Sequence, residues 1–188
     1  MMVLYRLACL VSFVALVGGC AVTEPDERDT ARVRAAVADS GAISISDLAS
    51  DLGISEVAVV RALPESMRVE LPADDLAGTL EAVCAIRPAR LIFRGRADSS
   101  QVVAEYNMGV TMLTDDEVVL AGENGFPQYH LNPADLVSVW MCRGELFGPA
   151  GRALFFYDSA GDPIMQWQAT EHASSISGYD ALWSRHQE

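Results

Sequence analysis

The chain has no lysine and only three histidines, and both shortages narrow the chemistry open to it. Its 13 basic side chains are all arginines, against 26 Asp and Glu residues, so the formal net charge is −13. Without lysine, enzymes that form a Schiff base and phosphate loops that depend on lysine are excluded. An acidic chain also repels nucleic acid, which proteins bind chiefly by neutralising phosphates, so we expect no nucleic-acid partner.

Motifs typical of catalysis are absent from the sequence as well. It contains no Gly-x-Ser-x-Gly, no Walker loop and no glycine-rich dinucleotide fingerprint. The acidic run at 115–117 lacks the ligand spacing of a calcium loop and is better interpreted as a solvated turn. We therefore expect that the protein is not an enzyme.

Residues 1–20 have the pattern of an export leader. Arg6 precedes an apolar run at 7–17, which is too short to span a bilayer, and small residues lead up to Cys20. This ending resembles a bacterial lipoprotein box, in which lipid is attached to the Cys20 thiol, and residues 21–30 would be a linker. It predicts a cell-envelope lipoprotein. Two alternatives remain for residues 1–20: an uncleaved anchor helix, or a misassigned start site. A misassigned start site would place the protein in the cytoplasm.

Two cysteines, Cys84 and Cys142, lie beyond the leader and linker, each in apolar surroundings. An exported protein could join them in a disulfide, but two separate buried thiols are favoured, because a free cysteine behaves as a small hydrophobic residue. The sequence has no Cys-x-x-Cys pair, which argues against structural zinc.

The hydrophobic pattern predicts helices first, then an antiparallel sheet, then a final helix. Residues 31–63 have helical spacing, with Ser46 and Ser55 as expected caps and Gly53 between two short helices. A helix is expected at 74–86, about seven to nine short strands follow from 89, and 174–187 is helical. The expected fold is α+β in one domain, 31–188: a helical part at 31–67, then a large curved antiparallel sheet with flanking helices at 68–188.

The two short helices around Gly53 resemble a helix-turn-helix. Their second helix carries Glu56 at its start and Arg61 as its one basic residue. A helix with so little positive charge reads bases and phosphates poorly. We therefore favour a helical packing module over a DNA-binding motif.

Three stretches occur in an informative order: VVRALPESM at 59–67, HLNPADL at 130–136 and LFFYDSAGD at 154–162. Together they resemble the bacterial haem-utilisation carrier proteins (HutX/ChuX-like), over about residues 31–170. The resemblance implies a protein of haem-iron acquisition that binds haem, or a related tetrapyrrole, in a cleft on its curved sheet. It also implies a homodimer.

The resemblance also implies a set of site residues. The family has His-x-His-Leu-x-Pro where this chain has Gln128, Tyr129 and His130, so His130 is the candidate axial ligand of haem iron. Arg94 falls at the family's other haem-associated histidine; it cannot bind iron, but its guanidinium suits a propionate. From the residues alone, His130 is better interpreted as a strand histidine with backbone partners, and Arg94 as part of a surface ion pair.

Tyr129 is a further candidate contact, and the aromatic run at 155–157 would supply apolar walls, with Phe156 named first and Phe155 or Tyr157 beside it. A second hypothesis is an envelope lipoprotein that keeps the fold as an interaction module without haem. The replacement of two family histidines, at Arg94 and Gln128, favours it, as does the lipoprotein-like start.

Overall fold

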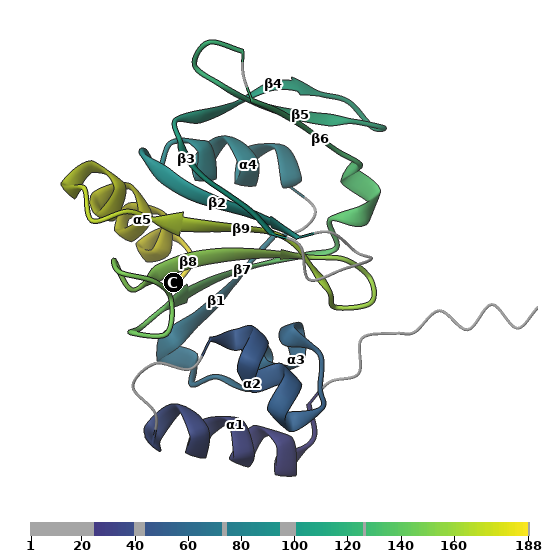
Figure 1. Ribbon diagram of the computed structural model, residues 1–188, viewed down its shortest axis with the longest axis vertical. Helices are drawn as coiled ribbons and strands as arrows, with labels where there is room; N and C mark the ends of the chain where they lie inside the picture. Colours follow the sequence, from purple (N-terminus) through teal and green to yellow (C-terminus); the bar gives the residue numbers. More distant parts are fainter. Residues whose placement is uncertain (1–24, 40–43, 73–74, 95–100, 126, 188) are drawn as a thin grey trace, which may run out of the picture.

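The computed structural model in Figure 1 describes residues 25–39, 44–72, 75–94, 101–125 and 127–187, with the backbone alone at 101–106. The expected leader, and Cys20 with it, lies outside the described residues. In the described ranges, no helix is long and apolar enough to cross a membrane.

Helices and strands follow the expected order. The α-helices are α1 (Glu27–Asp39), α2 (Ile45–Leu52), α3 (Glu56–Ala62), α4 (Leu76–Cys84) and α5 (Ala173–Arg185). The strands are β1 (Arg68–Leu71), β2 (Ala89–Arg94), β3 (Gln101–Tyr106), β4 (Met108–Leu113), β5 (Val118–Gly122), β6 (Gln128–Leu131), β7 (Ser138–Arg143), β8 (Arg152–Tyr157) and β9 (Pro163–Ala169). Two short 3₁₀ turns are η1 (Glu65–Met67) and η2 (Pro133–Asp135).

The strands form two antiparallel sheets, which confirms the α+β class. Six lie in the order β1-β7-β8-β9-β2-β3, and β4, β5 and β6 form a separate three-stranded sheet. We expected one large sheet; instead the chain leaves the first sheet after β3, with Asn107 as the one residue between β3 and β4. In Figure 1, α4 lies between the two sheets and α1–α3 lie together at the opposite end.

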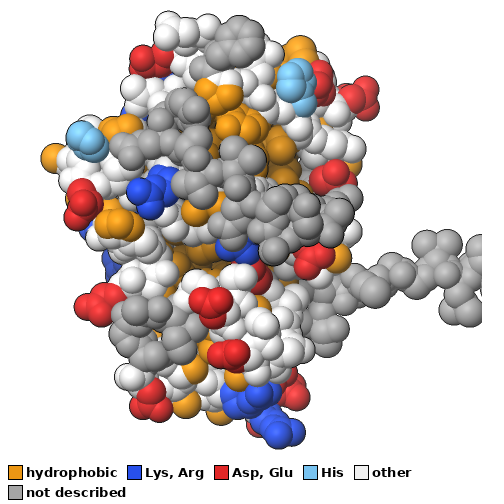
Figure 2. Space-filling view, viewed as in Figure 1, with side chains coloured by type: hydrophobic (Ala, Val, Ile, Leu, Met, Phe, Trp, Pro, Cys, Tyr) orange, Lys and Arg blue, Asp and Glu red, His pale blue; other side chains and the backbone are white. Residues whose placement is uncertain are grey.

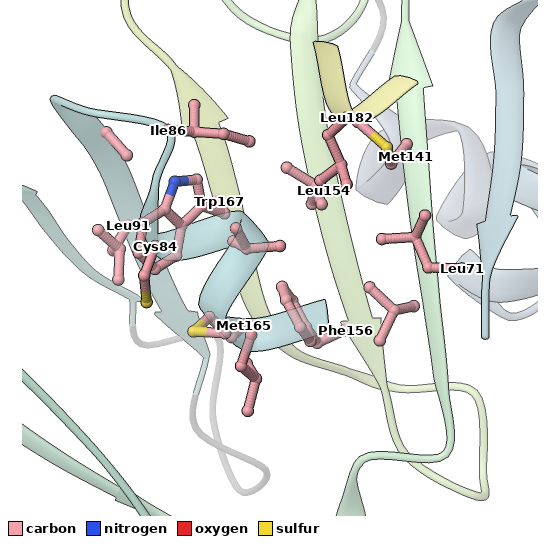
Figure 3. Packing of buried hydrophobic residues seen from close by; sticks show 14 of the residues in the cluster. Leu71, Cys84, Ile86, Leu91, Met141, Leu154, Phe156, Met165, Trp167 and Leu182 are labelled. Atoms are coloured by element: carbon pink, nitrogen blue, oxygen red, sulfur yellow. The ribbon is translucent and has the colours of Figure 1, made fainter. Parts of the chain in front are cut away.

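The main core occupies one face of the six-stranded sheet. Trp167, Phe156 and Leu91 are fully buried there, under α4, α5 and the inner face of the three-stranded sheet (Figure 3). Tyr179 of α5 also donates from its hydroxyl to the carbonyl of Cys142 at 2.7 Å and lies near that of Ala153 at 3.2 Å. The final helix is therefore fixed by both apolar packing and a buried hydrogen bond.

A second core covers the other face of the same sheet. Trp140, Phe155 and Tyr157 of the strands pack against Val59 and Val60 of α3. Every residue of α3 is buried except Arg61, which is half-buried. No face of this helix is open to reach a DNA groove, so the packing-module interpretation fits the structure.

Most predicted element boundaries hold, but two helix starts are corrected. α1 begins at Glu27, inside the expected linker, because the Asp26 carboxylate accepts the Asp29 N–H at 2.7 Å. The cap of α2 is Ser44 rather than Ser46: its Oγ accepts the Asp47 N–H at 3.1 Å. Ser55 caps α3 as predicted.

The edge strand β1 was not predicted, because it has four residues and follows a proline and a 3₁₀ turn closely. The two thiols lie in different cores, Cys84 in the main one and Cys142 in the second, and both are free. Burial raises the pKa of Cys84 to about 11 and that of Cys142 further. The favoured interpretation, two separate buried thiols, is what the structure has.

Candidate functional site

The predicted site residues fall on two sides of one aromatic contact. The ring of Phe93 in β2 stacks on that of Tyr129 in β6, with centroids 3.7 Å apart, and both pack against the main core. Side chains alternate along a strand, so His130 turns away from this contact on β6 and Arg94 turns away from it on β2. The structure therefore does not bring His130 and Arg94 into one cleft.

His130 is exposed and paired with a carboxylate. Its Nδ1 lies 2.6 Å from Oε1 of Glu117, and the two side chains are 56% and 41% exposed. An ionised carboxylate only accepts hydrogen bonds, so Nδ1 is the protonated nitrogen. In the neutral imidazole this leaves the Nε2 lone pair available, the arrangement common among metal-binding histidines.

Apolar side chains lie next to His130 on the three-stranded sheet. Its cross-strand neighbour is Val119 of β5, whose next partner is Met112 of β4. Met112 is exposed on the same side as His130, whereas the equally exposed Leu113 pairs with Val118 and lies on the other side of the sheet. This corner of the molecule therefore combines an imidazole with uncovered apolar surface.

Arg94 ends β2 and is paired with the first residue of α3. Its Nη1 donates a charge-assisted hydrogen bond to Oε1 of Glu56. The side chains of Arg94 and Glu56 are only 18% and 10% exposed. This interaction joins the helical part of the domain to the sheet.

Three buried polar atoms around this pair are unsatisfied. Arg94 Nε, Glu56 Oε2 and the Tyr157 hydroxyl have no hydrogen-bond partner among the residues that the structure describes. Burial raises the pKa of Tyr157 well above its ordinary value, and the Glu56 carboxylate raises it further, while Arg94 opposes them. The phenol thus stays neutral beside the ion pair.

The expected aromatic walls are enclosed. Phe156 is fully buried in the main core, while Phe155 and Tyr157 are buried in the second. A ligand would reach any of them only if one of the cores opened. Gln128, in contrast, is exposed on the same side of β6 as His130.

Two surface hollows involve none of the predicted residues. One, of about 290 Å³, is lined by Arg90, Pro149, Gln168, Ala169, Thr170, Glu171 and His172. The other is an open groove of about 720 Å³ beside the β7–β8 loop. Glycines at 144, 148 and 151, all at positive φ, shape that loop. Their spacing in the sequence could have indicated this tightly turned loop.

Sequence reasoning also missed both carboxylates. Glu117 meets His130 through the β5–β6 pairing, in which Val118 faces Leu131, and Glu56 meets Arg94 across 38 positions of the chain. Within the described ranges, no three His, Cys, Asp or Glu residues group closely enough to hold a metal ion.

No family model and no curated protein matches the sequence. Solved structures do match its fold. A crystal structure of a protein from Erwinia carotovora matches with TM-score 0.66 at 16% identity, covering 77% of this chain and 91% of that one. The haem-binding protein ChuX matches with TM-score 0.62 at 12% identity, covering 78% and 93%.

A structure of apo-PhuS, a haem-binding protein from Pseudomonas aeruginosa, matches with TM-score 0.62 at 15% identity, covering 99% of this chain and 52% of PhuS. This chain thus spans about half of PhuS and most of ChuX. The expected ChuX-like resemblance is confirmed at the level of the fold, which is all that identities this low show.

Proposed function

We propose that this protein binds haem or a related tetrapyrrole and carries it in haem-iron utilisation, with Nε2 of His130 as the axial ligand of the iron. The fold shared with haem-binding proteins supports the ligand class. The observation that carries the proposal is the His130–Glu117 pair, which holds an exposed imidazole in one tautomer. We propose a binding protein, not an enzyme.

The chemistry of this corner suits a planar ligand. A carboxylate at Nδ1 orients the ring and leaves Nε2 as the nitrogen that could bind iron. The exposed Met112, on the same side of the sheet as His130, offers apolar surface on which one face of a macrocycle could be buried, at about 25 cal/mol per Å². Tyr129, stacked on Phe93, stiffens β6 from behind.

A haemin titration of the protein, followed in the Soret region, tests the proposal. We expect saturable one-to-one binding, and a loss of affinity of roughly tenfold or more in His130→Ala, about the free energy of one good ligand contact. His172→Ala is the matched control and should bind like the unmodified protein. Equal binding by all three would remove His130 from the site, and no saturable band would remove the haem proposal.

We propose a homodimer, as the resemblance implies, and attachment to the envelope membrane through lipid on Cys20, the alternative being a cytoplasmic protein that starts further along the chain. Mass spectrometry of the native N-terminus separates the two. A diacylated Cys20 supports the envelope, and an unmodified N-terminus beyond residue 20 supports the cytoplasm. Light scattering gives the oligomeric state.

The second candidate is an envelope interaction module that keeps the fold without haem. Its supporting observation is that Arg94, the expected propionate partner, is used inside the protein by Glu56. An absent Soret band, with a lipidated Cys20, would favour it over the carrier.

A further inference from the structure

Two arginines meet in the open groove of about 720 Å³ beside the loop that joins β7 to β8. Arg143 ends β7 and Arg152 begins β8, and the two residues are directly opposite each other in the paired strands. Opposite residues of an antiparallel pair point to the same side of the sheet, and two like charges placed in this way destabilise it. Both side chains line the groove, so solvent and small solutes can reach them.

The two arginines differ in what neutralises their charge. Arg152 is satisfied within the protein: its Nε and Nη2 donate to the two carboxylate oxygens of Asp180 at 2.8 and 2.9 Å, and its Nη1 donates to the carbonyl of Ala150 at 2.8 Å. Among the described residues, no carboxylate forms an ion pair with Arg143, although Glu145 lines the same groove.

A shortage of acids does not explain this difference. The chain has 26 acidic residues for 13 arginines, and acidic side chains are spread widely over the face shown in Figure 2. Arg143 is therefore a positive charge that an acidic protein leaves without a partner next to a second arginine.

Arg143 is exposed, but contacts on two sides hold it in place. Its Nε donates to the backbone carbonyl of Ser66 at 3.0 Å, and its guanidinium carbon lies 4.5 Å from the ring centroid of Trp183. Trp183 is buried in α5 one turn after Asp180, so the same helix supports both arginines. Within the described ranges, Nη1 and Nη2 of Arg143 donate to no residue. They form a fixed pair of donors, which matches two oxygens of a carboxylate or phosphate.

Beyond Arg143, the groove offers apolar side chains and bare backbone. Met67, Pro149 and Ala150 line it together with three glycines of the loop. A Cβ on Gly144 would lie 2.7 Å from Cε of Met67, so a glycine is needed for the loop to approach this methionine so closely. Small-molecule sites in proteins measure about 300–1,000 Å³, so the groove has room for an organic molecule.

We propose that this groove binds a small organic anion, with Nη1 and Nη2 of Arg143 donating to two oxygens of its carboxylate or phosphate group. The anion does for Arg143 what Asp180 does for Arg152, and it offsets the repulsion between the two opposed arginines. Its apolar part lies against Met67. The net charge of −13 disfavours large polyanions, so the ligand is a small molecule. This site is independent of His130, which lies on the three-stranded sheet.

An NMR titration with benzoate, phenyl phosphate and the neutral benzamide tests the site. We expect both anions to shift the N–H signals of the loop glycines and of the Trp183 indole until the site is saturated, and benzamide to leave them unchanged. The anion that binds more tightly shows whether the groove prefers a carboxylate or a phosphate. Arg143→Gln should weaken anion binding roughly tenfold or more, the loss expected for one two-pronged charged contact.

Three further variants separate the geometry of Arg143 from its charge. Arg143→Lys keeps the charge without the fork of two donors, so it should recover only part of the affinity that Arg143→Gln loses. Arg28→Gln removes the same charge from an exposed position on α1, and His130→Ala removes the proposed iron ligand. Both should bind the anions like the unmodified protein, and thermal unfolding confirms that each variant is folded.

Weaker anion binding in Arg143→Gln, with Arg28→Gln unchanged, would support the site whatever the haemin titration shows. Equal binding of benzoate and phenyl phosphate by Arg143→Gln and the unmodified protein would overturn it. Benzamide binding as tight as that of benzoate would overturn it as well, because the groove would then recognise only the apolar ring. The absence of saturable shifts with either anion would have the same meaning.

Discussion

Two of the side-chain pairs that a carboxylate forms, Glu117–His130 and Glu56–Arg94, lie in contrasting surroundings. Glu117 and His130 meet on the outer side of a three-stranded sheet, each roughly half exposed. Glu56 and Arg94 meet between a helix and a six-stranded sheet, each more than four-fifths buried. Similar contacts therefore have different consequences: the exposed pair adds little to stability but orients a group that a ligand can reach, while the buried pair joins two parts of the domain.

The largest expected effect comes from breaking the buried pair. Glu56→Ala leaves the Arg94 guanidinium buried without a counter-charge, which we expect to lower the free energy of unfolding by about 3 kcal/mol. Urea denaturation measures this, with Glu65→Ala, at an exposed position, as the control. A loss below about 1 kcal/mol would mean that the pair behaves like a surface pair.

The stability of the protein at alkaline pH tests the raised pKa of Tyr157, the buried neighbour of the Glu56–Arg94 pair. The folded pKa of Tyr157 is raised well above 10, so the folded state keeps a proton that the unfolded chain releases near pH 10. Its contribution to stability is complete below that pH and is lost as the pH rises towards the folded pKa, at about 1.4 kcal/mol per pH unit.

Burial also raises the pKa of Tyr179, so this residue loses its contribution to stability in the same way. The buried thiols add to the loss of stability above about pH 8.5. Tyr157→Phe should therefore lose stability less steeply than the unmodified protein between pH 10 and 11. Urea titrations at both pH values measure the two slopes. Equal slopes would mean that Tyr157 ionises as freely in the folded protein as in the unfolded chain.

Replacing both members of the buried pair separates the loss of a counter-charge from the loss of packing. Glu56→Leu combined with Arg94→Met replaces the pair by apolar groups of similar size and leaves no charge stranded. We expect this double variant to lie within about 1 kcal/mol of the unmodified protein, well above Glu56→Ala. A double variant as unstable as Glu56→Ala would instead point to lost packing of the Glu56 side chain.

The smallest effect on stability belongs to the exposed pair. Glu117→Ala should change the free energy of unfolding by less than about 1 kcal/mol, because the side chains of both partners face solvent. Its effect on haemin affinity should be larger, roughly tenfold or more, because His130 loses the group that fixes its tautomer. Glu123→Ala, at another exposed acid, is the control for net charge.

Much of the fold followed from the sequence because its signals are local. The Ser55 cap, the Gly53 turn and the turn residues at 158–162 between β8 and β9 each depend on residues close together in the chain. The caps at Asp26 and Ser44 were missed because other polar residues nearby offer equally plausible starts. Strand β1 shows a weak alternation, Val69 and Leu71 against Arg68 and Glu70, but has only four residues.

The candidate site was less predictable because it depends on distant pairs. Which carboxylate meets His130 is fixed by the register of β5 against β6, and which meets Arg94 by how α3 lies on the sheet. The aromatic run at 155–157 suggests a ligand wall because alternation places its side chains on both faces of a strand. Alternation does not tell whether other elements cover both faces. Here α1–α3 cover one face and α4 and α5 the other.

The second core joins two of the three stretches that carry the family resemblance. Val59, Val60 and Leu63 of the stretch 59–67 pack in the same cluster as Phe155 and Tyr157 of the stretch 154–162. These two stretches are the two sides of one contact, so selection for packing alone is enough to retain them together. His130 lies outside that contact, on the three-stranded sheet. A substitution at position 130 would therefore leave the packing of the second core intact.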